Sequence, residues 1–155
     1  MVKEKILGII KNILKKEGYK KKSNSFYKTY NDVIFVINLQ KSQWGERFYI
    51  NIGLWYKKIE AEMEFPKEYQ CHLRFRIEDF QKIKHSINKI LDPNNDIVDI
   101  DKFEIEFKNI IPGLDNYLKE LSDKNKLLDI IQTKNTMSNR MDLKLRKWLG
   151  VNAGD

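Results

Sequence analysis

The stretch Val33–Lys57, VIFVINLQKSQWGERFYINIGLWYK, decides the fold. It predicts two antiparallel strands joined by a four-residue loop, with Ser42 opposite Arg47. In this register one face collects only apolar residues, which form the pairs Leu39–Ile50, Ile37–Ile52 and Phe35–Leu54. A shift of one residue would mix the two faces, so burial of the apolar face specifies the pairing.

The opposite face of this hairpin combines polar, aromatic and small residues. Its pairs are Gln40–Tyr49, Asn38–Asn51, Val36–Gly53 and Ile34–Trp55. Gly53 removes a side chain from the middle of the face, which could let a ligand approach the backbone. We therefore expect a binding site on this face, although the pattern indicates no particular reaction.

The segment before the hairpin predicts a helix and one further strand. Apolar residues recur at three- and four-residue spacing through residues 2–17, and Gly18 is typical of the left-handed residue that ends a helix. A strand is expected at residues 25–30. Asn31 and Asp32 tolerate positive φ, so they predict a tight turn into Val33.

After the hairpin, the sequence QCHLRFRI at residues 70–77 predicts a fourth strand because it alternates. We expect one side chain set to face the core and the other to face away. The core set is Cys71, Leu73, Phe75 and Ile77, and the other set is Gln70, His72, Arg74 and Arg76.

Residues 78–149 are predicted to be mainly helical. An apolar stripe runs from Phe80 to Leu91, and residues 101–110 fit both a strand and a helix, of which we favour the helix. Short helices are expected at 114–121 and 124–131, and an amphipathic one near the end. The order predicts a single α+β domain over residues 1–155. It holds an antiparallel four-stranded meander at about 25–30, 33–42, 47–57 and 70–77, with the N-terminal helix and several C-terminal helices on one face.

The net charge of +7 is concentrated at one end of the chain. Residues 1–30 carry nine lysines and two glutamates, whereas residues 31–155 carry twenty basic and twenty acidic side chains. Such a basic segment can attract nucleic acid, an acidic protein or an anionic membrane. Of the 29 basic residues 24 are lysine, and a solvated lysine-rich surface is the simpler interpretation. Proteins that read nucleic acid usually favour arginine.

The polar sheet face is the candidate binding site if the strand at 70–77 lies beside the strand at 47–57. The expected binding residues are Asn38, Gln40, Ser42, Tyr49, Asn51, Trp55, His72, Arg74 and Arg76. Their amides, guanidinium groups and rings suit a carboxylate, a phosphate, a flipped-out base or a protein partner. The alternative is a polar face that binds nothing and meets only solvent, later helices or its own side chains.

Few residues suit catalysis or metal binding. His72 and His85 are the two histidines of the chain, so a metal site would depend mainly on carboxylates, and we expect neither a metal nor a cofactor. On a strand, Cys71 and His72 would point to opposite faces, which argues against a Cys–His catalytic pair. The sequence holds no glycine-rich phosphate loop and no G-x-S-x-G motif. We assign no catalytic residue, and His72 would be the one general-base candidate.

The strand motifs resemble a known family. Asn38-Leu-Gln-Lys-Ser42, Gly45, Arg47-Phe-Tyr-Ile-Asn-Ile-Gly53, Cys71-His-Leu-Arg and Arg76 resemble the bacterial family called domain of unknown function 4304. The upstream Gly18-Tyr-Lys-Lys-Lys and Phe26-Tyr27 are similar to the usual opening of that family. The resemblance covers residues 5–130 and implies a small bacterial α+β protein, with no stated activity or cofactor.

Three functional hypotheses follow. The first is a non-enzymatic binding module whose polar and aromatic sheet face binds a protein partner, as an immunity protein or antitoxin does. The second is a nucleic-acid binder that uses Lys20, Lys21 and Lys22 for phosphates. The third is an enzyme for a small anionic substrate. The single cysteine and the lack of a long apolar run in residues 1–14 predict a cytoplasmic protein without a membrane partner.

Overall fold

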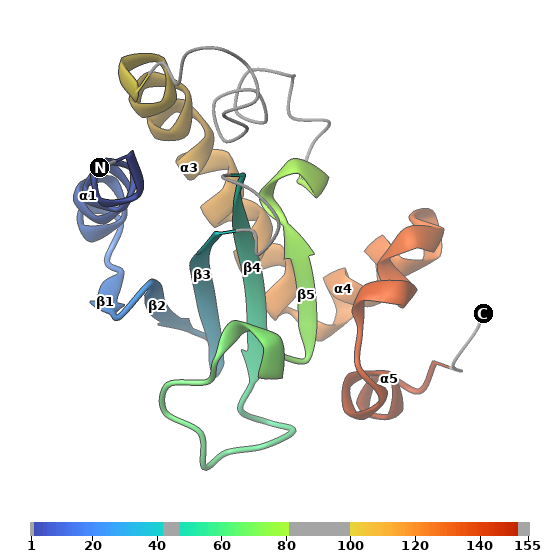
Figure 1. The fold of residues 1–155 in the computed structure, drawn as a ribbon. Coiled ribbons are helices and arrows are strands. Elements are labelled where there is room, and N and C mark those ends of the chain that lie inside the picture. The colour runs from blue at the N-terminus through green and yellow to red at the C-terminus, as the bar shows by residue number, and fades with distance from the viewer. Residues whose placement is uncertain (1, 42–46, 81–99, 152–155) are drawn as a thin grey trace.

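Five antiparallel strands form one sheet in the order β1-β2-β3-β4-β5 (Figure 1). The computed structural model describes residues 2–41, 47–80 and 100–151. The strands are β1 (Lys20–Lys22), β2 (Ser25–Tyr30), β3 (Val33–Lys41), β4 (Phe48–Tyr56) and β5 (Leu73–Arg76). The α+β class and the antiparallel meander are therefore confirmed, with one strand more than predicted.

The additional strand is β1, which lies between the predicted helix and the predicted strand at residues 25–30. Ser23 adopts a φ of 58°, so the chain turns back after three residues and Lys22 pairs with Ser25. A run of three lysines carries no apolar alternation, which is why periodicity did not detect the strand. Lysine on an edge strand also opposes pairing with other chains.

The predicted register of the central hairpin is confirmed. In the pairing of β3 with β4, Gln40 lies opposite Tyr49, Asn38 opposite Asn51 and Ile34 opposite Trp55. Asn31 and Asp32 have φ values of 48° and 60°, as expected for the tight turn between β2 and β3. The predicted pairing of Ser42 with Arg47 lies outside the described residues.

Helix α1 (Val2–Lys16) ends two residues before Gly18, the glycine that the sequence indicated. Gly18 has a φ of 91° and donates its backbone N–H to the Lys15 carbonyl oxygen, while the Tyr19 N–H donates to the Leu14 carbonyl oxygen. This is a Schellman ending, and the buried Tyr19 side chain supplies its hydrophobic contact.

Residues 101–110 belong to one long helix, α3 (Ile100–Ser122), which continues through the segment predicted as a separate helix. Pro112 lies inside it and removes a backbone donor, which costs about 3 kcal/mol in a helix interior. A continuous buried stripe offsets this cost. Its residues are Phe103, Phe107, Ile111, Leu114, Leu118 and Leu121.

The remaining elements are α4 (Lys124–Thr133), α5 (Leu143–Leu149) and the 3₁₀ helices η1 (Glu68–Gln70), η2 (Ile77–Asp79) and η3 (Asn135–Arg140). After η3 the chain reaches the edge strand β5, where Met141 makes an isolated bridge with Leu73. The stripe predicted from Phe80 to Leu91 lies outside the described residues, apart from Phe80 itself, which is buried.

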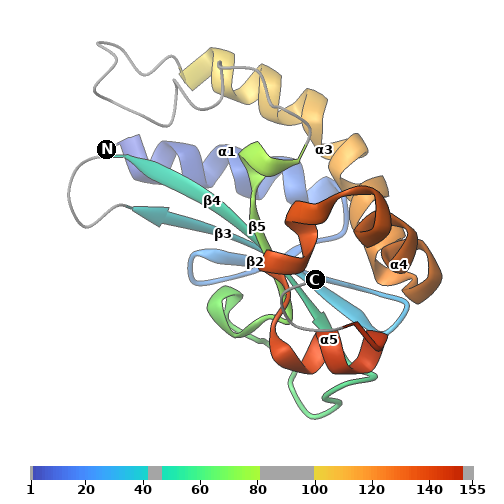
Figure 2. The same ribbon diagram turned by 90° about the vertical axis from the view of Figure 1, so that its right-hand side faces the viewer.

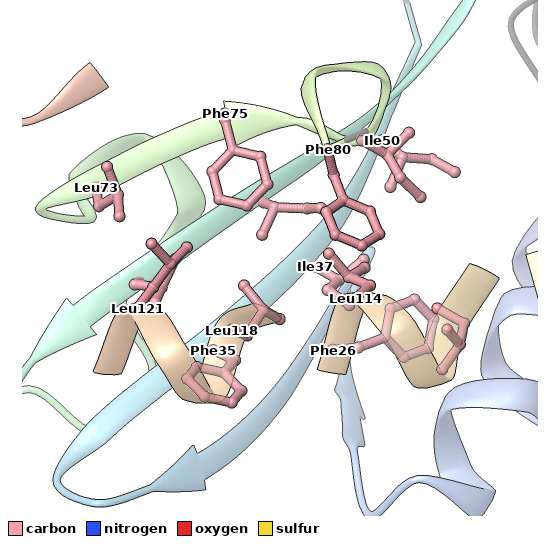
Figure 3. Packing of buried hydrophobic residues seen from close by; sticks show 14 of the residues in the cluster. Phe26, Phe35, Ile37, Ile50, Leu73, Phe75, Phe80, Leu114, Leu118 and Leu121 are labelled. Atoms are coloured by element: carbon pink, nitrogen blue, oxygen red, sulfur yellow. The ribbon is translucent and has the colours of Figure 1, made fainter. Parts of the chain in front are cut away.

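The main core lies between the sheet and the helices α1 and α3 (Figures 2 and 3). Every apolar residue predicted on the core face of the hairpin is at most 2% exposed: Phe35, Ile37, Leu39, Ile50, Ile52 and Leu54. Leu145 and Leu149 of α5 join the same core. The sheet face away from α1 and α3, here called the distal face, is therefore the one that can carry a site.

Candidate functional site

The distal face is divided into two halves by the connection between β4 and β5. Figures 1 and 2 show this connection, residues 57–72, on the side of the sheet opposite α1 and α3. It buries one end of the face, here called the covered half. The covered half is a small second core made by Tyr27, Ile34, Val36, Trp55 and Cys71, with Met63 packed against it.

Cys71 lies on the distal face, so its predicted position in the main core is wrong. Strand β5 begins only at Leu73, after η1, and the alternation therefore does not extend back to residue 71. A Cβ atom built on Gly53 would lie 2.7 Å from Cys71 Sγ and 2.8 Å from Cys71 Cβ. The space that Gly53 leaves is therefore filled by Cys71 and does not admit a ligand. Burial raises the pKa of the Cys71 thiol, which is then a packing group and not a nucleophile.

His72 and Trp55 hold the connection in place. His72 is 1% exposed, and its Nδ1 accepts the backbone N–H of Tyr56 at 2.9 Å. The neutral ring then carries its proton on Nε2, which lies 2.9 Å from Glu60 Oε1. The Trp55 ring stacks on His72 at 4.2 Å, and Trp55 Nε1 donates to the Glu60 carbonyl oxygen.

These contacts remove His72 as a general-base candidate and Trp55 as a ligand-binding ring. A general base needs a nitrogen that can reach a substrate, whereas both nitrogens of His72 are bonded within the protein. Glu60 is fixed from a second side by Lys144 Nζ at 2.8 Å. The hydrogen bonds from Lys144 and then from His72 lower the pKa of Glu60.

The other end of the distal face, here called the open half, holds most of the predicted binding residues. Its members are Asn38, Gln40, Tyr49, Asn51, Arg74 and Arg76. The pairing of β4 with β5 places Arg76 opposite Asn51 and Arg74 opposite Gly53, a register that the sequence could not supply. The predicted site residue Ser42 lies outside the described residues.

Hydrogen bonds order the amides of the open half. Asn51 Nδ2 donates to Gln40 Oε1 at 2.8 Å. Asn38 Nδ2 donates to Ser25 Oγ at 2.9 Å and to the Asn24 carbonyl oxygen at 3.3 Å. The first bond fixes the orientation of the Gln40 amide, so that its NH₂ group is the end available to a ligand.

The arginines of the open half differ in how they are held. Arg74 Nε and Nη2 donate to the two carboxylate oxygens of Glu68 at 3.0 and 3.3 Å. Arg76 instead lies over the Tyr49 ring, with its guanidinium carbon 3.9 Å from the ring centroid, and Arg47 approaches the same ring at 5.2 Å. Cation–π contacts keep both guanidinium groups close to the sheet.

A cavity of about 630 Å³ lies between the open half and the segment around η3. Its lining includes Gln40, Asn51, Arg74 and Arg76 from the sheet, together with Asp79 and Arg140. Arg140 Nη1 lies 2.6 Å from Asp79 Oδ2. Burial alone would raise the pKa of Asp79, but the hydrogen bonds from Arg140 and from the Arg76 backbone N–H outweigh burial and lower it.

The lysines of β1 are split between the two faces of the sheet. Lys20 and Lys22 pair with Tyr27 and Ser25, whose side chains lie on the distal face. Lys21 pairs with Phe26, which belongs to the main core on the other face. The three lysines therefore do not form one uniform cationic row, because successive side chains of a strand point in opposite directions.

Sequence reasoning missed four residues of the open half. Glu68 and Tyr69 come from η1, and Asp79 and Arg140 come from η2 and η3. Tyr69 is 61% exposed at the rim, whereas Glu68 is 9% exposed. None of them lies in an alternating segment. The one available signal in the sequence was Arg74 itself, because an arginine often pairs with both oxygens of a nearby carboxylate.

The fold and the distal face together define an α+β protein with one helix-covered and one partly open sheet face. The chain belongs to DUF4304, a family described as a domain of unknown function, whose model matches residues 10–150. Comparison with curated proteins and with solved structures gives no significant match.

Two kinds of feature are absent from the described residues. No group of three or more histidine, cysteine, aspartate or glutamate side chains in residues 2–41, 47–80 and 100–151 has the arrangement of a metal site. Within the same ranges, no helix has both the length and the apolar character that crossing a bilayer requires.

Proposed function

We propose that this chain is a non-enzymatic binding module whose open half binds a protein partner, in the manner of an immunity protein or antitoxin. The observation that carries the proposal is the gathering of anchoring groups at one polar cavity. Tyr69 is 61% exposed and the Arg74 side chain 48% exposed, and Arg76 lies nearby on the Tyr49 ring. Tyrosine and arginine are the side chains that most often dominate the energy of protein interfaces.

The state of the carboxylates supports binding over catalysis. Three carboxylates line the larger cavity, and each is already engaged within the protein. Glu68 accepts from Arg74, Asp79 from Arg140, and Asp142 from the backbone N–H of Leu145. Among the described lining residues, no side chain is thus placed as an activated nucleophile or as a general base within reach of a substrate.

The split of the β1 lysines ranks the nucleic-acid hypothesis below the protein hypothesis. A strand of nucleic acid is bound best by cations that follow its backbone in one direction. Lys21 lies on the opposite face from Lys20 and Lys22. We retain nucleic acid as an outcome that the experiment below distinguishes.

The proposal includes a location in the bacterial cytoplasm. The support is limited to the resemblance of the strand motifs and to the lone cysteine, Cys71, which is a buried free thiol. A reduced thiol is stable where thiols are kept reduced.

A co-purification with a matched control tests the proposal. Tagged wild type, Tyr69→Ala/Arg76→Gln and Leu143→Ala/Lys147→Gln would be passed through lysate of the source cell, and protein and nucleic acid in each eluate would be identified. Leu143 is 58% exposed and Lys147 is also exposed, so the control likewise removes one large and one cationic side chain from the surface, here from α5. Arg74 and Trp55 are left intact, because Arg74 pairs with the buried Glu68 and Trp55 is itself buried.

We expect one protein in stoichiometric amount with wild type and with the control, and its loss with Tyr69→Ala/Arg76→Gln. A complex that survives in both variants would contradict a role for the open half. Nucleic acid recovered in place of protein would move the function to the basic N-terminal segment.

A further inference from the structure

A second cavity of about 470 Å³ extends the open half toward β1. Lys22, Asn38 and Tyr27 line it from the sheet, and Phe65 and Lys67 line it from the connection between β4 and β5. It shares Gln40, Glu68, Tyr69 and Arg74 with the first cavity. Its size is within the range of ligand pockets. One of the N-terminal lysines and the polar sheet face therefore belong to one continuous surface.

The charges around this second cavity are unbalanced. Three cations line it, Lys22, Lys67 and Arg74, against the single carboxylate of Glu68. Glu68 is taken by Arg74, and no ion pair of Lys22 or Lys67 is found with any residue of the described ranges. Lys22 Nζ lies instead 4.2 Å from the centroid of the Phe65 ring, and Lys67 Nζ lies 5.9 Å from that of Tyr69.

Hydrogen-bond donors without an acceptor in the described protein meet at the same place. Glu68 accepts hydrogen bonds from Nε and Nη2 of Arg74, so Nη1 of the guanidinium group remains available to donate to a ligand. Gln40 accepts from Asn51 through Oε1, which leaves its Nε2 amide. Ammonium, guanidinium and amide donors around one cavity fit a planar, singly charged acceptor such as a carboxylate.

We propose that the partner contacts this second cavity through an acidic segment, of which one aspartate or glutamate carboxylate is received between Lys22 and Arg74. The inference rests on the proposed function and names the chemistry of the partner surface. The aromatic rings of Phe65 and Tyr69, 40% and 61% exposed, form the apolar rim beside the carboxylate. The nearly buried Glu68 carboxylate limits the excess to two positive charges, which suits a short acidic segment better than a run of phosphates.

The test uses a fluorescein-labelled hexaglutamate peptide, with hexaglutamine and oligothymidylate as comparison probes. Anisotropy titrations would compare wild type, Lys22→Gln/Lys67→Gln and Lys5→Gln/Lys11→Gln. The last variant removes the same charge from exposed positions of α1, away from the cavity. Thermal unfolding of each variant would establish that the fold is kept.

We expect hexaglutamate to bind with a Kd below about 1 mM and hexaglutamine to bind at least about tenfold more weakly. Lys22→Gln/Lys67→Gln should weaken binding by about fivefold, the effect of losing two exposed charge pairs, and the α1 control by less than about twofold. Equal weakening in both variants, or no binding of hexaglutamate, would overturn the inference. Preferential binding of oligothymidylate that depends on Lys22 and Lys67 would replace it by a nucleic-acid site.

The two proposals can fail separately. If hexaglutamate does not bind while the co-purified protein is lost with Tyr69→Ala/Arg76→Gln, the open half binds a partner. The proposal that this partner uses an acidic segment would then be wrong. If hexaglutamate binds through Lys22 and Lys67 but no protein depends on Tyr69 and Arg76, the cavity is an anion site and the partner proposal is wrong.

Discussion

The covered half and the open half of the distal face share strands β3 and β4 but differ in whether their side chains are buried. In the covered half, Trp55 stacks on His72 and belongs to one buried cluster with Cys71, and Trp55 is only 5% exposed. In the open half, Arg74 and Arg76 remain exposed beside two cavities. The difference arises where the connection between β4 and β5 crosses the sheet. A polar and aromatic sheet face is therefore not a single site, since part of it can be a second core.

The largest expected effect is that of Trp55→Ala on stability. This change removes a buried ring, its stacking on His72 at 4.2 Å and its hydrogen bond to Glu60. We expect a loss of about 3–5 kcal/mol in the free energy of unfolding, measured by urea denaturation. Tyr69→Ala is the matched change in the open half, and because Tyr69 is exposed it should shift stability by no more than about 0.5 kcal/mol. Similar losses in the two variants would abolish the distinction between the halves.

Gly53→Ala should produce the next largest effect. The added methyl group would lie 2.7 Å from Cys71 Sγ and 2.8 Å from Cys71 Cβ, neither of which belongs to a long flexible side chain. We expect a loss of about 1–3 kcal/mol from overpacking, again by urea denaturation.

Gly8→Ala in α1 is the control for Gly53→Ala. No atom lies within 4 Å of the position that its Cβ would take, and alanine favours the helix, so a gain of up to about 1 kcal/mol is expected. If Gly53→Ala were neutral or stabilising, the connection would not be packed against the sheet at this point.

The sequence predicted the parts of the fold in which burial repeats at a fixed period. The hairpin register follows from the uniformly apolar pairs Phe35–Leu54 and Ile37–Ile52, since any shift would expose them. The end of α1 follows from Gly18, whose φ of 91° is unfavourable for other residues. Both are local signals that a single sequence contains.

The division of the distal face could not be predicted, because it depends on tertiary contacts that local periodicity does not indicate. Residues 59–65, IEAEMEF, alternate as a strand would but form none, so the pattern did not indicate that residues 57–72 cross the sheet over Gly53. The prediction that Cys71 continues strand β5 failed for the same reason, since η1 interrupts the pattern. Likewise, separate helices were predicted at 101–110 and 114–121, whereas burial of one long stripe maintains a single α3.

The smallest predicted effect concerns Asp79, which fixes the wall of the open half. Its Oδ2 accepts from Arg140 and from the backbone N–H of Arg76, and these hydrogen bonds hold the pKa of Asp79 below its ordinary value despite the opposing effect of burial. A carboxylate whose pKa is lower in the folded state stabilises the protein above its unfolded pKa. The contribution is lost as the pH falls through the folded pKa, because protonation then accompanies unfolding.

Asp79→Asn should therefore reduce the loss of stability on acidification between about pH 5 and pH 3. Asp79 and Arg140 are both partly exposed, so solvent screening limits the difference from wild type to a few tenths of a kcal/mol. Urea denaturation at several pH values would measure it, with Asp129→Asn on α4 as the background for removing one exposed carboxylate.

If Asp79→Asn leaves the pH dependence of the free energy of unfolding unchanged, Arg140 does not hold Asp79 in solution. The wall that η3 contributes to the larger cavity would then be free to move, and Arg76 would lose the carboxylate that fixes its backbone. The open half would become a surface ordered only by its partner. In contrast, a reduced acid dependence would indicate that the cavity is preformed, and a preformed site avoids the cost of ordering these side chains on binding.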